Sequence, residues 1–160
     1  MRSAFAEGLS HLARRELSEA QVRERLARLD YASPLIDEAV ERLRACGALD
    51  DFRVAVAVAR TEAQVKHRGR LRIQRRLADL GIDAEVASRA LDEVFANLDE
   101  SAMLAQALAR RLRVPHAAIT DAAQFRRLHQ HLVRLGFPPD AVTALLRRRT
   151  RPGSSAVDEE

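Results

Sequence analysis

The sequence predicts an all-α protein, arranged as an elongated array of three tandem three-helix repeats of the helix-turn-helix kind. Composition is the first reason: of 160 residues 47% are apolar and only 4% aromatic, and strong helix formers dominate. Self-similarity is the second, because segments that begin at Leu26, Leu77 and Leu132 align at offsets of 51 and 55 residues. Cap residues at recurring places in the chain are the third.

The first repeat is expected over residues 1–49. Ser18 predicts an N-cap, and Gln21 three residues later completes a capping box. The next helix is expected to begin at Ser33-Pro34, with the serine as cap, and to end before Gly47. The predicted apolar stripes of these two helices are Val22, Leu26 and Leu29, then Ile36, Ala39, Val40, Leu43 and Cys46.

The second repeat is expected over residues 50–98. Asp50-Asp51 predicts a helix start, although the alternating run 54–58 also fits a buried strand; the caps and the length favour the helix. The middle helix is expected to end at Gly81, and the third to follow the cap Asp83. The predicted stripes are Phe52, Ala55, Val56 and Ala59; Ile73, Leu77 and Leu80; and Val86, Ala87, Ala90, Leu91 and Val94.

The third repeat is expected over residues 99–150, with a flexible tail over 151–160. Asp99 predicts the first cap, Val114-Pro115 a break, and Pro138-Pro139-Asp140 the start of the last helix. The predicted stripes are Leu104, Leu108 and Leu112; Phe125, Leu128, Leu132 and Leu135; and Val142, Leu145 and Leu146.

A repeat of about fifty residues with one narrow stripe on each helix buries little surface alone, so neighbouring repeats are expected to pack on one another. No stretch approaches the ~20 apolar residues of a spanning helix, and Glu7 interrupts the first residues, so we expect neither a membrane anchor nor a signal peptide. The single cysteine fits a reducing compartment. We therefore expect a cytoplasmic monomer in which Cys46 is a buried small hydrophobe.

Basic residues are unevenly distributed, although the net charge is only +4. The local charge rises from −1 over residues 1–50 to +2 over 51–98 and +3 over 99–160. Over residues 60–76, seven basic residues stand against the single acid Glu62. Since like charges on one face repel one another, this concentration favours a partner that is acidic or carries phosphates.

The candidate partner-binding residues form two basic clusters. In the first, four arginines from Arg68 to Arg76 are spaced i, i+4, i+7 and i+8, which predicts one helix face opposite the apolar stripe. A solvated face without a partner is the alternative, and for the second cluster the alternative is a cationic cap of the last helix. The candidates are Lys66, Arg68, Arg70, Arg72, Arg75 and Arg76, then Arg147, Arg148 and Arg149.

The sequence contains none of the constellations that carry catalysis or hold a metal. His129 and His131 are two residues apart, so on a helix their rings point about 160° apart. There is no glycine-rich phosphate loop, nucleophile elbow or paired carboxylate motif. We expect no enzyme activity, no catalytic residue, no cofactor and no metal.

Three segments resemble one protein family. They are LARRELSEAQVRERL over 12–26, GALDDFRVA over 47–55, and GRLRI over 69–73 followed by Leu77 and Leu80-Gly81-Ile82. These segments, within a similarity over residues 4–149, resemble the RecX regulatory proteins of bacteria. The resemblance implies a tandem array of three-helix modules that binds the RecA recombinase filament on single-stranded DNA, in its helical groove. It further implies inhibition of the recombinase, ATPase and coprotease activities of RecA, in DNA repair, recombination and the SOS response.

Four positions depart from the family pattern. Asp30 stands at a turn where the two later repeats carry glycine, and a positive φ there would cost an acid about 1 kcal/mol. Val54 stands where the family has an aromatic residue. Arg70 replaces a frequent proline and Arg76 a frequent glutamate, and both changes add basicity.

The leading hypothesis is therefore a regulator of the RecA filament. A sequence-independent nucleic-acid-binding helical protein with no RecA partner is the alternative, and a scaffold for another helical protein is the third. The sequence leaves open whether such a regulator blocks filament growth, disassembles the filament or inhibits it in place.

Overall fold

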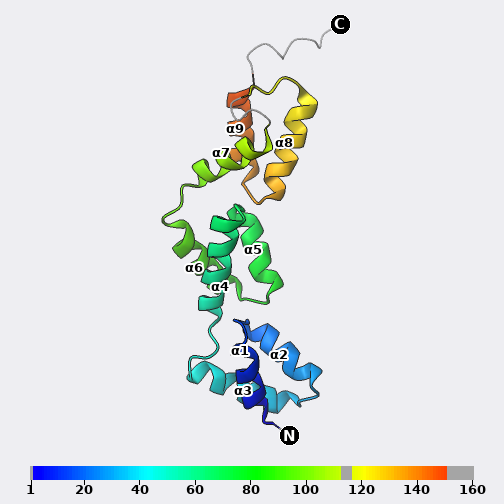
Figure 1. The fold of residues 1–160 in the computed structure, drawn as a ribbon, viewed down its shortest axis with the longest axis vertical. Helices are drawn as coiled ribbons and strands as arrows, with labels where there is room; N and C mark the ends of the chain where they lie inside the picture. Colours follow the sequence, from blue (N-terminus) through cyan, green and yellow to red (C-terminus); the bar gives the residue numbers. More distant parts are fainter. Residues whose placement is uncertain (1, 113–116, 151–160) are drawn as a thin grey trace. The chain divides into compact units, whose positions relative to one another are not determined.

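The computed structural model describes residues 2–112 and 117–150, and this part of the chain is helical (Figure 1). It contains nine α-helices and one π-helical turn, and its β-type pairing is an isolated bridge between Ile119 and Thr150. The predicted all-α class is confirmed. The predicted break at 114–115 and the predicted tail over 151–160 lie outside the described residues.

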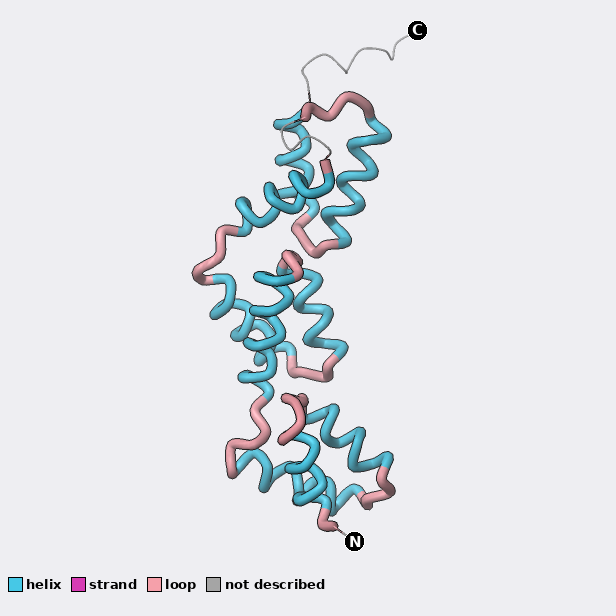
Figure 2. Tube along the Cα trace, viewed as in Figure 1, coloured by secondary structure: helices cyan, strands magenta, loops and turns pink. Residues whose placement is uncertain are grey.

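Turns and loops join the described helices (Figure 2). In chain order the elements are α1 (Ala4–Leu12), α2 (Glu19–Arg28), α3 (Ser33–Ala45), α4 (Asp51–Arg60), the π-helical turn η1 (Thr61–Val65), α5 (Arg70–Asp79), α6 (Ala84–Phe95), α7 (Glu100–Arg111), α8 (Ala122–Arg134) and α9 (Pro139–Arg149). The run 54–58 lies in α4, so the helix favoured over the strand alternative is confirmed. The boundaries of the three repeats stay predictions.

The chain divides into two compact units. Unit 1 comprises the residues up to 61 together with 74–94, and unit 2 comprises 62–73 together with the residues from 95 onwards. Helix α5 contributes to both, because its first four residues belong to unit 2 and the others to unit 1. In the described part of the chain, no helix is long and apolar enough to cross a membrane.

The same turn ends the helices α2, α5 and α8. The carbonyl groups of Leu26, Leu77 and Leu132 each accept a hydrogen bond from the N–H five residues later, at 3.3, 3.2 and 3.3 Å. The residues with positive φ in these turns are Asp30 (61°), Gly81 (71°) and Gly136 (98°). This is the Schellman arrangement, in which a left-handed residue lets the chain close over the last helical turn. The three leucines that align in the sequence therefore hold the same position in three turns.

The helix starts follow the predicted caps, with one correction. Ser18 Oγ accepts from the Gln21 N–H at 3.3 Å, and Gln21 Oε1 accepts from the Ser18 N–H at 3.2 Å, which confirms the capping box. Asp50, Asp83 and Asp99 also accept backbone N–H groups, as predicted.

Ser33 was expected to cap α3, and this prediction is wrong. Ala32 holds the N-cap position without a side-chain hydrogen bond, and Ser33 is the first helical residue. The reason is the turn before the helix. Ala32 follows the left-handed Asp30 by two residues, as Asp83 follows Gly81, so the turn sets the helix start and overrides the preference of the serine.

Each unit has an apolar core built from the predicted stripes. The core of unit 1 includes the fully buried Val22, Leu26 and Leu43, and that of unit 2 includes Leu132 and Leu146. These residues recur at helical spacing on the inner faces of their helices. Packing these faces together removes the apolar stripes from water, which is the main force that holds three short helices together.

Leu29 and Cys46 were expected in the buried stripes, and both predictions are wrong. Leu29 is 50% exposed, and Cys46 is also exposed. Both residues are C-caps, one position beyond the last residue of α2 and α3, so the chain has already begun to turn away from the core there. Cys46 Sγ donates a hydrogen bond to the Leu43 carbonyl at 3.4 Å.

Candidate functional site

Two of the candidate cations lie just after the π-helical turn, in unit 2. Glu62 in this turn is only 4% exposed. Its Oε1 accepts a hydrogen bond from Lys66 Nζ at 2.6 Å, and its Oε2 lies 3.3 Å from Arg68 Nη1. A buried carboxylate is tolerated when cations neutralise it. Lys66 and Arg68 therefore serve this carboxylate within the fold.

Arg68 does not share the predicted helix face. Helix α5 begins at Arg70, so Arg68 precedes it. The segment is not helical because His67 has a left-handed φ of 52° and the Gly69 N–H donates to the Leu135 carbonyl at 2.8 Å. Neither feature has a signal in the local sequence, since one follows a π-helical turn and the other joins residues 66 positions apart.

A glycine pair docks the start of α5 on the turn after α8. An added Cβ on Gly69 would come 2.6 Å from the Phe137 nitrogen, and one on Gly136 would come 2.5 Å from both the nitrogen and the Cβ of Arg72. The Leu71 N–H also donates to the Gly136 carbonyl at 3.1 Å. Glycine at both positions permits this close approach of two backbones.

Arg70 and Arg72 make contacts inside unit 2. The Arg72 side chain donates from Nη1 to the Arg134 carbonyl at 3.0 Å, and so reaches the C-terminal end of α8. A cation at this end of a helix complements the helix dipole. The Arg70 guanidinium lies 5.6 Å from the centre of the Phe95 ring.

Arg75 and Arg76 lie on the part of α5 that belongs to unit 1. Both side chains are exposed, whereas Ile73 and Leu77 of the same helix are fully buried. For these two arginines the predicted face opposite the apolar stripe is therefore confirmed. Among the described residues, no carboxylate is recorded in an ion pair with either.

The second candidate cluster lies in the last turn of α9, as predicted. Arg147 and Arg148 are exposed, and the Arg149 carbonyl accepts a hydrogen bond from the Ile119 N–H at 2.9 Å. Arg148 also lines a cleft of about 240 Å³ formed by residues of α7, α9 and the turn before α9, Leu104 and Phe137 among them. The position of these arginines complements the carbonyl end of the helix.

Sequence reasoning did not group Arg111, His131 and Arg134 with the candidate cations. Arg134 is the residue whose carbonyl receives Arg72. The pKa of His131 is lowered by burial first, and then by the positive charges of Arg111 and Arg134. These residues come from the ends of α7 and α8 and from the start of α5. They are far apart in sequence, so no local motif could have grouped them.

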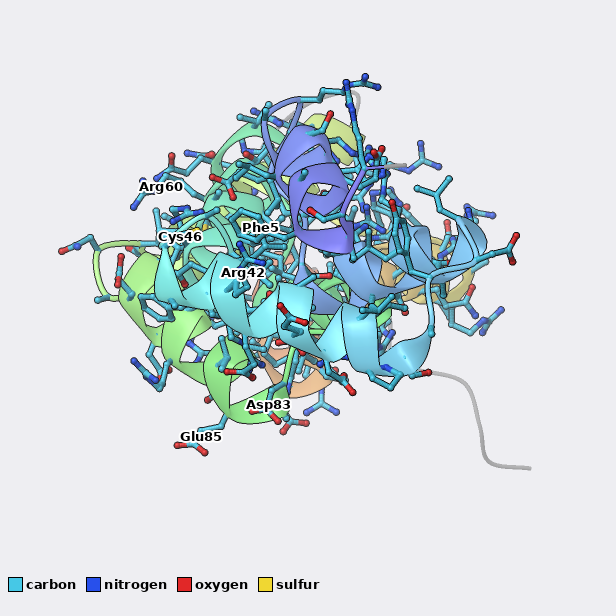
Figure 3. The ribbon with its side chains drawn as sticks, turned by 90° about the horizontal axis from the view of Figure 1, so that it is seen from below. Phe5, Arg42, Cys46, Arg60, Asp83 and Glu85 are labelled. Carbon is cyan, nitrogen blue, oxygen red and sulfur yellow. The ribbon has the colours of Figure 1, made fainter. Side chains whose placement is uncertain are left out.

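Unit 1 pairs many of its charges internally. Arg23 bonds to Glu19 at 2.8 Å and to Asp37 at 2.6 Å. The Arg42 guanidinium lies over the Phe5 ring, 4.2 Å from its centre, and Figure 3 labels both residues. These contacts give the two arginine side chains partners within the fold.

A cleft of about 680 Å³ in unit 1 has such paired charges along its wall. Arg53, one of its lining residues, bonds to Glu16 at 3.0 Å. The half-buried Asp51 accepts the Glu19 N–H at 2.8 Å, and burial is the main cause that raises the pKa of Asp51. The cleft therefore holds a mixture of both charges rather than one sign.

The two units differ in charge. Over the described residues, unit 1 has 13 basic and 15 acidic residues, a net charge of −2, whereas unit 2 has 12 basic and 5 acidic residues, a net charge of +7. Glu62 already engages Lys66 and Arg68. The other basic residues of unit 2 therefore outnumber the carboxylates that remain to pair with them. The basic character predicted for the middle and end of the sequence is thus concentrated in unit 2.

Two family models match the chain, one over the helices α1 to α3 and the other over α4 to α6. The model of the first three-helix domain of RecX matches residues 4–43, and that of the second three-helix domain matches residues 50–91, together more than half of the chain. The chain belongs to the RecX family. The predicted third repeat lies outside these two ranges.

Curated RecX relatives support the assignment. The regulatory protein RecX of Syntrophotalea carbinolica is 32% identical over 137 residues, and the match covers 84% of this chain and 88% of that protein. That of Geobacillus thermodenitrificans is 31% identical over 160 residues, but the match covers 100% of this chain and only 57% of the relative. The chain thus spans little more than half the length of the Geobacillus relatives.

Solved RecX structures share the fold. The crystal structure of RecX from Lactobacillus salivarius aligns with a TM-score of 0.74 at 22% identity, over 91% of this chain and 93% of that one. A second crystal structure, of a regulatory protein RecX, aligns with a TM-score of 0.75 at 20% identity, over 91% of this chain and 70% of that one. The helical fold of the family is therefore confirmed for most of the chain.

Proposed function

We propose that this RecX-family chain binds the RecA recombinase filament on single-stranded DNA, in the helical groove of the filament, and inhibits its recombinase, ATPase and coprotease activities. Membership of the RecX family carries the proposal, together with the name of regulatory protein that its relatives bear. The protein acts by binding rather than by catalysis, as a cytoplasmic monomer.

Exposed arginines supply the electrostatic part of this binding. Arg75 and Arg76 project from α5 opposite its buried stripe, and Arg147 and Arg148 project from the end of α9. Several exposed charges that act together accelerate association with an oppositely charged surface even where each contributes little to folding. Lys66 and Arg68 contribute less to the partner because Glu62 engages them.

The direct test is the ATPase activity of RecA on single-stranded DNA, with and without this protein. We expect a decrease in ATP hydrolysis that reaches a plateau near stoichiometric binding to the filament. Unchanged hydrolysis at a stoichiometric excess of the protein would contradict the proposal. Light scattering on the protein alone measures its mass in solution and so tests whether it is a monomer.

The charge of unit 2 favours a second candidate function, sequence-independent binding of nucleic acid without RecA. A net charge of +7 over the described residues of one unit attracts a polyanion. The two functions separate in one comparison at ~0.15 M salt. If bare DNA binds as tightly as a RecA–DNA filament, and binding falls steeply with salt, the nucleic-acid function is favoured.

A further inference from the structure

A phenylalanine and an arginine bridge the first and third helices in each of the first two predicted repeats. Phe5 is the second residue of α1, and the Arg42 guanidinium of α3 lies 4.2 Å from the centre of its ring (Figure 3). Phe52 is the second residue of α4, and the Arg89 guanidinium of α6 lies 5.0 Å from the centre of its ring. Both rings are half-buried and both arginines are exposed, so each ring fills the space between two helices under a cation.

The third predicted repeat lacks this pair. Its first helix, α7, has Ser101 as its second residue. By the repeat offsets of 51 and 55 residues, Ala144 of α9 stands at the position of Arg89, and Arg148 of α9 stands at the position of Arg42. The aromatic ring is therefore missing, while one of the two arginine positions keeps its cation.

A cleft lies where the ring is missing. Ser101, Ala144 and Arg148 all line the cleft of about 240 Å³ in unit 2. The lining also includes the buried Leu104 and Phe137, which give it an apolar floor. Sites for small molecules typically enclose about 300 Å³ or more, so this cleft has the size for one side chain rather than for a cofactor.

We propose that this cleft binds an aromatic side chain of a protein partner, at a segment where acidic residues flank the aromatic one. The bound ring takes the place that Phe5 and Phe52 fill within their own repeats. Arg148 lies over its face as a cation, and the apolar floor removes the ring from water. Aromatic residues that enter such pockets supply much of the affinity of protein interfaces.

The charges around the cleft favour acidic residues beside the aromatic one. Arg148 is exposed, and in the described part of the chain no carboxylate makes an ion pair with it. Glu100 also lines the cleft, but it is the first residue of α7, where the helix dipole stabilises its negative charge. The net charge of +7 over the described residues of unit 2 attracts further carboxylates of the partner.

The test uses the full chain and needs no RecA, so its outcome stands apart from that of the proposed function. The probe is a five-residue peptide, acetylated and amidated at its ends, in which two acidic residues stand on each side of one phenylalanine. The control peptide has alanine in place of the phenylalanine. The readout is the shift of the methyl resonances of Leu104 and Leu145, which line the cleft, in NMR spectra of the titrated chain.

We expect the phenylalanine peptide to shift these resonances and to bind at least about tenfold more tightly than the alanine peptide, because only the first buries a ring. Arg148→Gln should weaken its binding about threefold, since the cation over the ring is lost. Arg127→Gln, which removes an exposed arginine of α8 outside the cleft, is the matched control and should leave the affinity nearly unchanged.

Ser101→Phe gives the third repeat the ring that the first two repeats have, so it should fill the cleft from within. We expect this variant to melt at or above the temperature of the parent chain and to bind the phenylalanine peptide at least about tenfold more weakly. Ser88→Phe adds the same ring at an exposed position of α6 and should bind like the parent. Normal peptide binding by a folded Ser101→Phe variant would overturn the site.

The remaining outcomes are also decisive. If Ser101→Phe unfolds, Ala144→Met fills the cleft from α9, and normal binding by this folded variant overturns the site. Equal binding of the two peptides, or no shift of the leucine resonances at ~10 mM phenylalanine peptide, shows that the cleft takes no aromatic side chain. If thymidine monophosphate binds more tightly than the peptide, and Ser101→Phe abolishes this binding, the occupant is a nucleobase and the proposal is wrong.

Discussion

Asp30 shows how one residue departs from a repeated turn without changing it. Its φ of 61° lies in the left-handed region that Gly81 and Gly136 occupy in the other two turns, and its turn keeps the same hydrogen bond from Tyr31 to Leu26. A side chain with a Cβ is strained in this region, although aspartate tolerates it better than most residues. This turn therefore carries a small local strain that the turns at Gly81 and Gly136 lack.

Replacing Asp30 with glycine should relieve this strain. We expect Asp30→Gly to raise the free energy of unfolding by about 0.5 to 1 kcal/mol, because glycine adopts positive φ without a Cβ clash. Urea denaturation of the full chain measures the change. Asp30→Ala is the control, since it removes the charge but keeps the Cβ, and it should not stabilise the protein. A glycine variant no more stable than the parent would contradict the strain.

His131 should make the protein less stable in mild acid. Burial, then Arg111 and Arg134, lower the pKa of His131 below its ordinary value of 6.5. The unfolded chain then binds the proton more readily than the folded chain, so the free energy of unfolding falls as the pH drops below about 6.5, and nothing is lost above it. A His131→Gln variant should lose less stability than the parent between about pH 7 and 5.

NMR titration of the His131 ring measures its pKa directly. In the Arg111→Gln, Arg134→Gln variant the pKa should rise only part of the way towards 6.5, because burial, the largest cause, persists. A pKa at or above 6.5 in the parent chain would show that neither burial nor the arginines act on the ring.

At the scale of elements, the connection between α4 and α5 sets the chemistry of unit 2. The π-helical turn buries Glu62, which draws Lys66 and Arg68 to itself. The following glycine pair then docks α5 against the turn after α8. Of the basic residues in this segment, Lys66 and Arg68 thus pair with a carboxylate of the fold, whereas Arg75 and Arg76 are exposed.

The docking of α5 predicts a difference between two glycines with positive φ. Gly47 has φ of 72° with open space around an added Cβ, whereas on Gly136 that atom would come 2.5 Å from Arg72. Gly47→Ala should cost about 1 to 2 kcal/mol from backbone strain alone. Gly136→Ala should cost clearly more, because it adds a steric clash with another backbone. Thermal unfolding of both variants makes the comparison, and equal losses would show that the close approach contributes no stability.

At the scale of the whole molecule, the net charge of +4 conceals two units of opposite sign. Unit 1 pairs arginines with carboxylates, while unit 2 has more cations than acids to receive them. Unequal charge of this kind steers association more than it stabilises a fold. A partner with exposed phosphates or carboxylates would therefore be attracted mainly by unit 2 and by the exposed arginines of α5.

The arginines of α5 should matter for binding and not for folding. We expect Arg75→Ala with Arg76→Ala to leave helicity and the melting temperature nearly unchanged, since exposed charges typically contribute below ~1 kcal/mol each. Association with a RecA filament should become slower and less sensitive to salt. Stopped-flow kinetics measure the rate, with Arg14→Ala and Arg15→Ala as the control pair. If the variant binds the filament normally, these arginines form a solvated face without a partner. If the variant unfolds, they are needed for the fold.

Local patterns predicted the helices, most of their caps and the recurring turn. The aligned leucines and the residues after them specify the turn because a Schellman cap needs only a left-handed residue and an apolar neighbour, which lie within six positions of each other. The family assignment also follows from local segments. These features need no contact between distant residues, so the sequence by itself determined them.

Only the tertiary structure decided which arginines are available to a partner. The sequence predicted Arg68 and Arg72 on one helix face, but Arg68 precedes α5 and pairs with the buried Glu62, while Arg72 stays exposed and donates to the end of α8. Charge at a site depends on which side chains the packing brings within a few ångströms, and that is settled by backbone docking between segments far apart in the chain.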